Sequence, residues 1–233
     1  MRYEIIKRAT FLSRPNRFIA YVELDGKEEK VHVKNTGRCK ELLVPGATVI
    51  LADGQNEKRT TQYDLVAVYK EEDKLINMDS QAPNKVVGEW LTQTKRFGEV
   101  INIRPEFSYG ESRIDFYFET RQSDGGIKKN LMEVKGVTLE KQGMCRFPDA
   151  PTARGVKHLL ELKKAAEEGF RTYLMFVLQM EAAIGVAPND VTDPAFGQAL
   201  RMVTKAGVVP LAYTCHVKEN ELSIASELPV QMW

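Results

Sequence analysis

The chain has no charge excess of either sign and few residues that break or cross-link structure. Its 233 residues include 33 Lys and Arg against 32 Asp and Glu, a formal net charge of +1. That balance excludes a histone-like or polybasic protein that holds nucleic acid through bulk charge. With only 16 Gly and 10 Pro, and with 43% hydrophobic and 28% charged residues, the composition predicts an ordinary globular protein without long disordered stretches.

Long apolar runs and cysteine pairs are also missing. No window approaches the roughly 18 consecutive apolar residues that a membrane span needs, and the start, Met1-Arg2-Tyr3-Glu4, lacks the apolar region of a signal peptide. Cys39, Cys145 and Cys215 are widely spaced and form no C-x-x-C pair, which argues against a disulfide framework and a zinc site. We therefore expect a cytoplasmic protein with reduced, packed thiols and no membrane partner.

Several familiar motifs are absent as well. The chain contains no G-x-G-x-x-G, no P-loop and no G-x-S-x-G elbow, so a small-molecule enzyme of sugar metabolism has little support. It also lacks a convincing helix-turn-helix, which weakens sequence-specific readout of DNA and leaves architectural binding open.

Residues 1–80 carry short β-like runs between turn signals such as Asp25-Gly26 and Pro45-Gly46. Four or five short strands without a long helix predict a small OB-like barrel that ends near residue 80. The runs cover residues 18–23, 30–33, 48–51 and 63–69.

Residues 81–233 begin with a helical pattern. Val86, Val87, Trp90 and Leu91 recur at helical spacing, and Asn84 is available as the N-cap. The predicted order of helix, three strands, helix, strand, helix and strand describes an α/β or α+β domain with a mixed sheet. The strands cover residues 100–107, 113–119, 130–137, 171–179 and 208–216, and the later helices cover residues 152–168 and 194–206, the second beginning after Asp193.

Acidic and basic side chains stand on two consecutive predicted strands of this second domain. Glu133 and Lys135 are two residues apart, so a strand displays them on one face, with Met132 and Val134 on the other. If the strand that carries Asp115 pairs next to theirs, two carboxylates converge beside one ammonium group.

This arrangement suits a divalent metal ion. Two neighbouring carboxylates repel unless a cation lies between them, and hard oxygen ligands suit Mg²⁺ or Mn²⁺. We predict that Asp115 and Glu133 bind one of these ions, which polarises a phosphodiester, while Lys135 positions water or stabilises the developing charge. The alternative is an ion pair across the sheet, with both carboxylates lying against Lys or Arg neighbours.

The order of these residues resembles the PD-(D/E)xK nuclease superfamily, in which an Asp is followed by E-x-K on strands after an opening helix. In that superfamily the first helix often contributes a further carboxylate, and Glu89 is the matching candidate. Glu106 is the other carboxylate that could face the same cleft. Both are candidate catalytic residues, with a solvated position on an amphipathic helix as the alternative for Glu89.

Five segments resemble the sugar fermentation stimulation protein A (SfsA) family more closely still. The match runs in order from about residue 8 to residue 230, which is nearly the whole chain. The segments are residues 35–38, 106–110, 112–116, 133–139 and 147–159, the last being the most specific.

That resemblance implies an N-terminal OB-fold, residues 1–80, joined to a C-terminal PD-(D/E)xK nuclease-like domain, residues 81–233. It implies a DNA-binding protein with a link to the regulation of maltose metabolism in enteric bacteria, and it implies Asp115, Glu133 and Lys135 as the nuclease-type residues. A catalytic reaction is an inference from the site, because a fold alone does not establish one.

The helix predicted over residues 152–168 displays Arg154, Lys157 and His158 on one face. Placed after the metal-site strand, they could contact a phosphate or orient a leaving group, and Thr152 could cap the helix where anions bind well. The alternative is a solvated basic face with a histidine at the edge of the core.

We take Arg154 and His158 as catalytic candidates. Lys157, together with Arg113 on the Asp115 strand, is a candidate nucleic-acid contact, and Gln179 at the end of its strand could edge the site.

A basic segment with aromatic side chains opens the first domain. The segment from Arg2 to Arg17 contains five basic residues and only one acidic residue, Glu4. Cations that follow a nucleic-acid backbone, with aromatics that stack on bases, are typical of single-strand grooves on OB-folds. The predicted contacts are Arg8, Arg14, Arg17, Phe18, Asn35 and Arg38, and further cations nearby are Lys34, Lys40, Lys58 and Arg59.

The alternative for this segment is that its aromatics lie in the core and its charges form a solvated rim. Asn35 could likewise serve, with Thr36 and Gly37, only to build a tight turn.

Two hypotheses from different classes follow. The first is a DNA-binding protein that hydrolyses phosphodiester bonds with a divalent metal ion. The second is a non-catalytic DNA-binding regulator of sugar-metabolism genes, whose nuclease-like fold only holds the duplex. The sequence leaves open DNA or RNA as substrate, endo- or exonucleolytic cutting, and the oligomeric state, a homodimer included.

Overall fold

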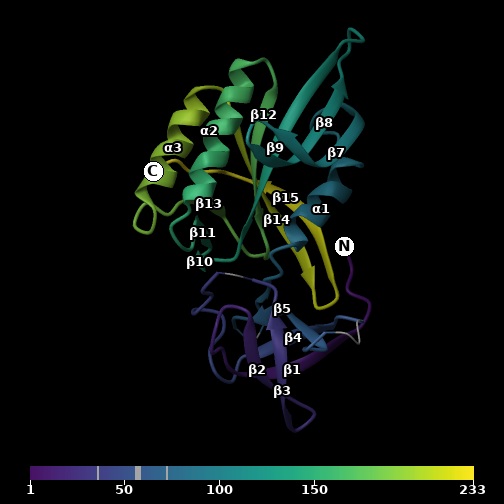
Figure 1. Cartoon of the computed structure of the whole chain (residues 1–233), viewed down its shortest axis with the longest axis vertical. Coiled ribbons are helices and arrows are strands. Elements are labelled where there is room, and N and C mark those ends of the chain that lie inside the picture. The colour runs from purple at the N-terminus through teal and green to yellow at the C-terminus, as the bar shows by residue number, and fades with distance from the viewer. Residues whose placement is uncertain (36, 56–58, 72) are drawn as a thin grey trace.

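The N-terminal strands close into the predicted OB barrel (Figure 1). In the computed structural model, which describes residues 1–35, 37–55, 59–71 and 73–233, β1 pairs with β2 and β4, and a parallel pairing of β3 with β5 closes the circle. Thr36 and Lys58, both part of the expectations above, lie outside the described residues. The strands are β1 (Ile6–Ser13), β2 (Ile19–Leu24), β3 (Lys27–Val33), β4 (Thr48–Asp53), β5 (Tyr63–Tyr69) and β6 (Leu75–Asn77), which extends the sheet beyond β5.

β1 runs through the basic segment that we expected to form nucleic-acid surface. Ala9 and Phe11 point into the barrel, and only 2% of Phe11 is exposed, while Lys7 and Arg8 remain at least partly accessible. The strand is missing from the sequence-based prediction because its charged side chains hide a short inward-facing apolar pattern.

The second sheet is mixed, as predicted, and has the order β15-β14-β12-β9-β8-β7. β9, β12 and β14 are parallel to one another, and the outer pairings are antiparallel. Its strands are β7 (Glu99–Tyr109), β8 (Ser112–Arg121), β9 (Ile127–Val137), β12 (Arg171–Leu178), β14 (Val209–Lys218) and β15 (Glu221–Leu228); β10 (Glu140–Lys141), β11 (Met144–Phe147) and β13 (Gly185–Pro188) form a small separate sheet. The prediction omitted β15 and the small sheet.

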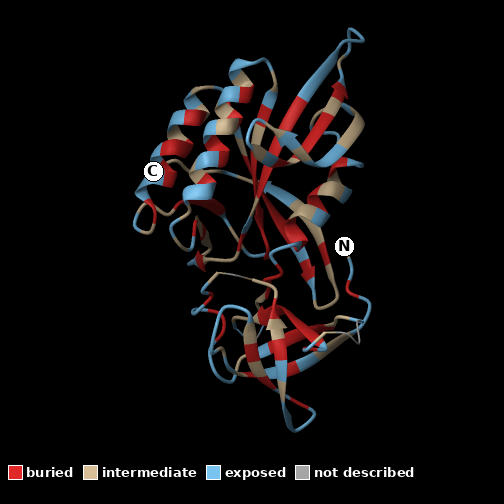
Figure 2. Cartoon of the chain, viewed as in Figure 1, coloured by how far each residue is buried: buried red, intermediate tan, exposed pale blue. Residues whose placement is uncertain are grey.

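Helices cover both faces of the second sheet. α1 (Ala82–Leu91) buries Val86 and Val87 against Met132 and Val134 of β9. α2 (Ala153–Glu167) and α3 (Pro194–Lys205) pack on the opposite face, where their buried apolar residues join the cluster that also fills the barrel. Figure 2 shows buried residues along the central strands and on the sides of these two helices that face inward.

The caps of these helices differ from the prediction at one position. Thr152 caps α2 by accepting from Gly155 N at 3.0 Å, and Asp193 caps α3 by accepting from Phe196 N at 3.0 Å, as expected. The predicted cap at Asn84 is wrong, because α1 begins two residues earlier with Pro83 in its first turn, a position where proline costs no hydrogen bond. The side chain of Asn84 is therefore free to serve the site described below.

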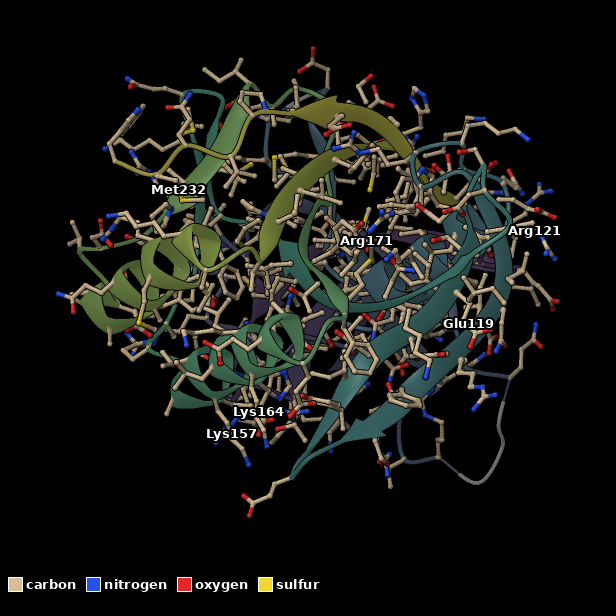
Figure 3. The ribbon with its side chains drawn as sticks, turned by 90° about the horizontal axis from the view of Figure 1, so that it is seen from above. Glu119, Arg121, Lys157, Lys164, Arg171 and Met232 are labelled. Carbon is tan, nitrogen blue, oxygen red and sulfur yellow. The ribbon has the colours of Figure 1, made fainter. Side chains whose placement is uncertain are left out.

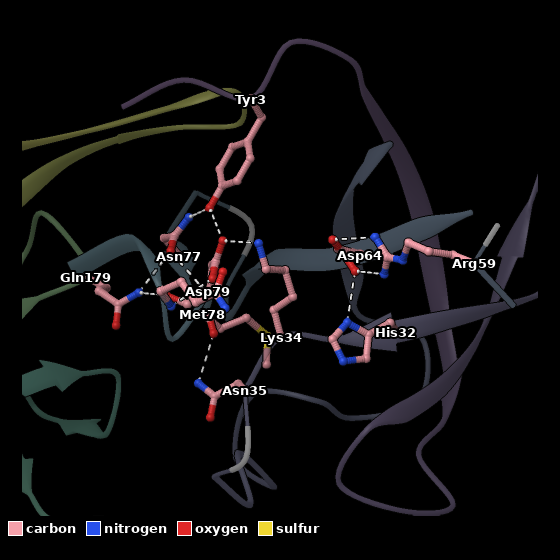
Figure 4. Close-up of polar contacts among 11 residues, drawn as sticks. Tyr3, His32, Lys34, Asn35, Arg59, Asp64, Asn77, Met78, Asp79 and Gln179 are labelled. Carbon is pink, nitrogen blue, oxygen red and sulfur yellow. Dashed lines mark hydrogen bonds and ion pairs between the residues drawn. The ribbon is translucent and has the colours of Figure 1, made fainter. Parts of the chain in front are cut away.

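The two sheets are joined by a buried polar network around Asp79, which has no exposed surface (Figure 4). Lys34 Nζ lies 3.0 Å from Asp79 Oδ2, and the Tyr3 hydroxyl donates to the same oxygen at 3.2 Å. Asn77 donates to the Tyr3 hydroxyl and accepts from Gln179 of the second sheet at 2.9 Å. Burial, followed by the charge of Asp79, raises the pKa of Tyr3, so this hydroxyl stays protonated.

All three cysteines are free and buried, as predicted. Among the described residues, no helix is long and apolar enough to cross a membrane.

We expect Lys34→Met to lower the free energy of unfolding by about 3 kcal/mol, because it leaves the buried Asp79 carboxylate without its cation. Urea denaturation at pH 7 measures the effect, with Lys27→Met at an exposed position as the matched control. Equal stability of Lys34→Met and the control would show that the buried ion pair does not stabilise the protein.

Candidate active site between two diverging strands

The site lies where β8 and β9 separate. Their antiparallel ladder ends at Phe116 opposite Met132. Beyond that pair, β8 continues beside β7 as far as Ser112, whereas β9 continues beside β12 as far as Val137. The two strands diverge, and polar side chains occupy the resulting split.

Asp115 is the first β8 residue beyond the ladder. Its Oδ2 accepts from the backbone N–H of Val134 at 2.7 Å, so the side chain replaces the backbone acceptor that a continued ladder would have supplied. Asn84 of α1 donates to Oδ1 at 2.7 Å. Both carboxylate oxygens are thus held in place, and Asp115 stands next to β9.

Glu133 and Lys135 share one face of β9, as the alternation predicted. Met132 and Val134 pack on the other face, against α1. Lys135 Nζ lies 2.6 Å from Glu133 Oε1, and His158 Nδ1 of α2 bonds to the same oxygen. Arg154 donates to His158 Nε2 at 3.4 Å, which leaves the Nδ1 proton of the imidazole for Glu133.

The pKa values of the two carboxylates are shifted in opposite directions. Burial raises the pKa of Asp115 to about 6, and the nearby charge of Glu133 contributes to the rise, although the hydrogen bonds from Val134 and Asn84 oppose it. Burial also acts to raise the pKa of Glu133, but the hydrogen bond from His158 and the charge of Lys135 outweigh burial and leave that pKa below its usual value. Glu133 therefore loses its proton first as the pH rises, and Asp115 ionises only as the pH passes through about 6.

The donor set fits a hard divalent cation with few protein ligands. Glu133 is only 2% exposed, yet its Oε2 has no hydrogen-bond partner among the described residues. The described chain holds no group of three or more His, Cys, Asp and Glu side chains arranged around one metal position. Two carboxylates with one unsatisfied oxygen suit Mg²⁺, which is commonly bound through one or two carboxylates, waters and substrate phosphates.

The two additional carboxylates lie differently from each other. The residues on either side of Glu106 pair with Phe116 and Ile114 of β8, so the backbone of Glu106 is opposite Asp115. Its φ is +53°. Its exposed carboxylate lies 3.7 Å from the Arg113 guanidinium. Glu89 instead binds the N-terminal ammonium group at 2.6 Å. The structure brings Glu106 to the neighbouring strand and gives Glu89 a partner outside the Asp115 and Glu133 group.

The predicted nucleic-acid contacts of the second domain lie near the end of the β7–β8 hairpin. Arg113, two residues before Asp115, has 66% of its side chain exposed. Lys157 is half-exposed and lies 3.8 Å from Glu111 at the tip of the β7–β8 hairpin. Figure 3 shows Lys157 and Lys164 projecting outward from α2. None of these cations contacts Asp115 or Glu133 directly within the described residues.

Three of the predicted barrel contacts have internal partners. The Arg14 guanidinium donates to four backbone oxygens, those of Arg17, Asn35, Gly37 and Arg38, at 2.7–2.9 Å. Asn35 accepts from Gly37 N at 2.7 Å and donates to Met78 O at 2.9 Å, which is the tight-turn role left open above. Arg8 Nε lies 2.6 Å from Glu219 of the second domain.

The other predicted barrel contacts remain on the surface. Phe18 is 48% exposed, in contrast to Phe11, and the Arg17 guanidinium lies 5.4 Å from its ring centroid. A groove of about 460 Å³ is lined by Arg17 and by the exposed Arg38 and Lys40. Lys34 and Arg59, by contrast, are paired with Asp79 and Asp64.

The sequence did not predict the role of Asn84 in the site, and it placed Gln179 only at the edge of the site. The sequence predicts Asn84 as a helix cap, yet its amide donates to the Asp115 carboxylate from α1, which covers the face of the sheet opposite Glu133 and Lys135. Gln179 is 1% exposed and bonds across to the barrel residue Asn77. No local signal could reveal either contact, because each joins segments far apart in the sequence.

Fold and site together define a class of two-domain proteins, in which an OB barrel precedes a mixed sheet with two carboxylates and a lysine at a strand split. Comparison with known proteins assigns the family. Residues 12–78 match the family model described as the SfsA N-terminal OB domain, and residues 81–221 match the sugar fermentation stimulation protein RE domain. The chain belongs to the sugar fermentation stimulation protein family.

Relatives align over nearly the full length. The chain is 49% identical over 230 residues to a sugar fermentation stimulation protein homolog of Clostridium beijerinckii, covering 99% of both chains. It is 50% identical over 232 residues to the homolog of Desulfitobacterium hafniense, covering 100% of this chain and 99% of the other. The solved structure of Pyrococcus furiosus SfsA in complex with Ca²⁺ superposes with a TM-score of 0.84 at 27% identity, over 99% of this chain and 98% of that one.

We expect Asp115→Asn to raise the free energy of unfolding by about 1–2 kcal/mol at pH 8 and to change it little near pH 4. A carboxyl with a raised folded-state pKa contributes its stability below the unfolded-state pKa and loses it as the pH rises through about 6. One pKa unit corresponds to about 1.4 kcal/mol, and the partial exposure of Asp115 reduces the expected gain.

Urea denaturation at both pH values provides this measurement, with Asp73→Asn at an exposed position as the control. An Asp115→Asn protein that is less stable than the parent at pH 8 would contradict the assignment of Asp115 as the carboxyl with the raised pKa.

Proposed function

We propose that this protein is a cytoplasmic, divalent-metal-dependent nuclease that binds DNA and hydrolyses its phosphodiester bonds. The observation that carries the proposal is the unpartnered Oε2 of the buried Glu133 next to Asp115. A buried carboxylate oxygen without a partner is costly, and a cation shared with Asp115 removes that cost. The same cation offsets both the burial and the repulsion by Glu133 that raise the pKa of Asp115.

Each residue of the site has a chemical task in this proposal. Asp115 and Glu133 would hold the Mg²⁺ or Mn²⁺ ion, which when bound polarises the phosphodiester. Lys135 places an ammonium group where negative charge develops on the phosphate during attack. His158 holds Glu133 in position through its Nδ1 proton, and Arg154 fixes that tautomer from the preceding turn of α2.

A related structure supports the metal in this proposal. The Pyrococcus furiosus protein was solved with Ca²⁺, another hard cation that prefers oxygen ligands. Its fold matches this chain from end to end, so a divalent cation is compatible with the family architecture.

Two surfaces would bind DNA. On the barrel, the groove with Arg17, Arg38 and Lys40 offers cations, and the exposed Phe18 offers a face for base stacking. On the second domain, Arg113 and Lys157 flank the split and would contact phosphates near the reacting bond.

A second candidate function is a non-catalytic DNA-binding regulator of sugar-metabolism genes. One observation favours it: Glu133 Oε1 already lies against Lys135 and His158, so much of the carboxylate charge is balanced without a metal. In that case DNA binding would need no divalent ion and would tolerate Asp115→Ala.

Cleavage assays separate these candidates. We expect the wild-type protein to cut labelled single- or double-stranded DNA with Mg²⁺ or Mn²⁺, and we expect Asp115→Ala/Lys135→Ala to be slower by at least about 100-fold. Asp73→Ala/Lys27→Ala, at exposed positions of the barrel domain, is the matched control. Cleavage at the same rate by the Asp115→Ala/Lys135→Ala protein would remove the catalytic proposal and leave the regulator.

Binding assays test the barrel groove. Replacing Arg17 and Arg38 together by Ala should weaken binding to single-stranded DNA and lower the slope of log Kd against log salt by about 1 for each phosphate that is no longer neutralised. Fluorescence anisotropy over a salt series in EDTA gives the slope, and Arg121→Ala, which removes another exposed arginine, is the control. An unchanged slope in the double variant would place the DNA elsewhere.

A further inference from the structure

A cavity of about 160 Å³ lies between the barrel and the second sheet, outside the Asp115 and Glu133 group. Asn35, Gly37 and Ser80 line it from the barrel side, and Gly136, Phe147 and Gln179 line it from the other. Gly136 directly follows Lys135 on β9. The cavity thus lies at the end of the strand that carries the candidate catalytic lysine, although the Lys135 side chain does not line it.

Gln179 presents an unused acceptor to this cavity. The residue is 1% exposed, and its amide nitrogen donates to Asn77 Oδ1 at 2.9 Å and to Asp79 O at 3.1 Å. Its Oε1 has no hydrogen-bond partner among the described residues, and Figure 4 shows this oxygen pointing away from Asn77 and Asp79. The network around Asp79 therefore fixes the amide so that its oxygen remains available as an acceptor for a ligand donor.

Gly136 keeps that acceptor accessible. A Cβ at this position would lie 2.6 Å from Gln179 Oε1 and 2.7 Å from Pro83 Cγ, so any side chain would cover the oxygen or clash with α1. The φ of Gly136 is not in the left-handed region, so backbone conformation does not require a glycine here. The close approach of Gln179 and Pro83 requires it.

The rest of the lining favours a neutral, polar and flat ligand. Arg146 and Asp149 both line the cavity, and their opposite charges leave no net charge for an anion or a cation to pair with. The half-buried Phe147, whose ring centroid lies 5.6 Å from that of Phe176 and 5.0 Å from that of Phe196, adds an aromatic side chain to the lining, and Ser80 adds a hydroxyl. Aromatic walls with hydrogen-bonding edges are the means by which proteins hold unstacked nucleobases.

The volume selects the size of the ligand. A protein cavity of about 150 Å³ accommodates benzene, so a volume of about 160 Å³ suits one six-membered ring. A pyrimidine base has that size and carries an N–H donor for Gln179, at the ring N3 of thymine and uracil or the amino group of cytosine. A purine, with two fused rings, would extend beyond this volume, so we expect it to bind less tightly.

We propose that this cavity binds a single unstacked pyrimidine base of the nucleic-acid strand that enters the split. Gln179 accepts from the base, Phe147 contacts its ring, and the sugar and phosphate remain outside the cavity. This assignment rests on the proposed function for the identity of the strand, whereas the fit of the free base to the cavity does not depend on cleavage.

The test measures binding of free nucleosides by saturation-transfer NMR. Thymidine and cytidine are compared with adenosine, using the wild-type protein, Ser80→Phe, which fills the cavity from an exposed backbone position, and Ser123→Phe, which adds the same ring in a distant exposed turn. Asp149→Phe fills the cavity from the opposite wall, so that a folding defect in one variant does not decide the outcome. Circular dichroism confirms that each variant is folded.

We expect saturation transfer to the pyrimidine ring protons in the wild type and in Ser123→Phe, a reduction of about 10-fold in affinity in Ser80→Phe and Asp149→Phe, and weaker transfer to adenosine. Absence of a pyrimidine signal in the wild type, or equal signals in the cavity-filling variants, would overturn the base pocket. Cleavage of DNA by the wild type in that event would leave the nuclease proposal standing. Pyrimidine binding without any cleavage would keep the pocket and remove the nuclease.

Discussion

The hydrogen bond from Val134 N–H to the Asp115 carboxylate is the interaction on which the candidate site depends. When β8 leaves β9, a backbone N–H of β9 loses its partner, and an unpaired buried amide is costly. The first side chain beyond the last pair supplies the acceptor at 2.7 Å. The sheet can therefore open without leaving that group unsatisfied, and the same contact sets a carboxylate beside Glu133.

Opening the sheet at this point has two consequences. Glu133 and Lys135 remain on a strand that is still paired with β12, so their positions are rigid, while polar side chains fill the space that β8 vacates. α2 limits that space from the other side, since His158 reaches Glu133 and Tyr109 of the β7–β8 hairpin bonds to Glu168 at the end of the helix. Three elements, β8, β9 and α2, therefore build the site around the Glu133 carboxylate.

The polar links between the domains place the barrel groove relative to this site. Asp79 joins Tyr3, Lys34 and, through Asn77, Gln179 in one buried network. A second link is Glu140, whose carboxylate lies 2.7 Å from both Lys70 and Lys74 of the barrel domain. Burial acts to raise the pKa of Glu140, but these two lysines outweigh it and lower that pKa to about 2. Such charged contacts are directional, and they fix how the two domains face each other.

The amino-acid sequence by itself determined the elements and the chemical character of the site. Two-residue alternation placed Glu133 and Lys135 on one face, short runs between turns predicted the barrel, and the capping residues Thr152 and Asp193 located two helix starts, because all of these depend on neighbours along the chain. Only the tertiary structure decided which polar side chains form internal hydrogen bonds and which remain available to a ligand. Asn84 holds Asp115, Arg14 is used by four backbone oxygens and Gln179 faces a cavity, because each contact joins residues brought together by folding rather than by sequence.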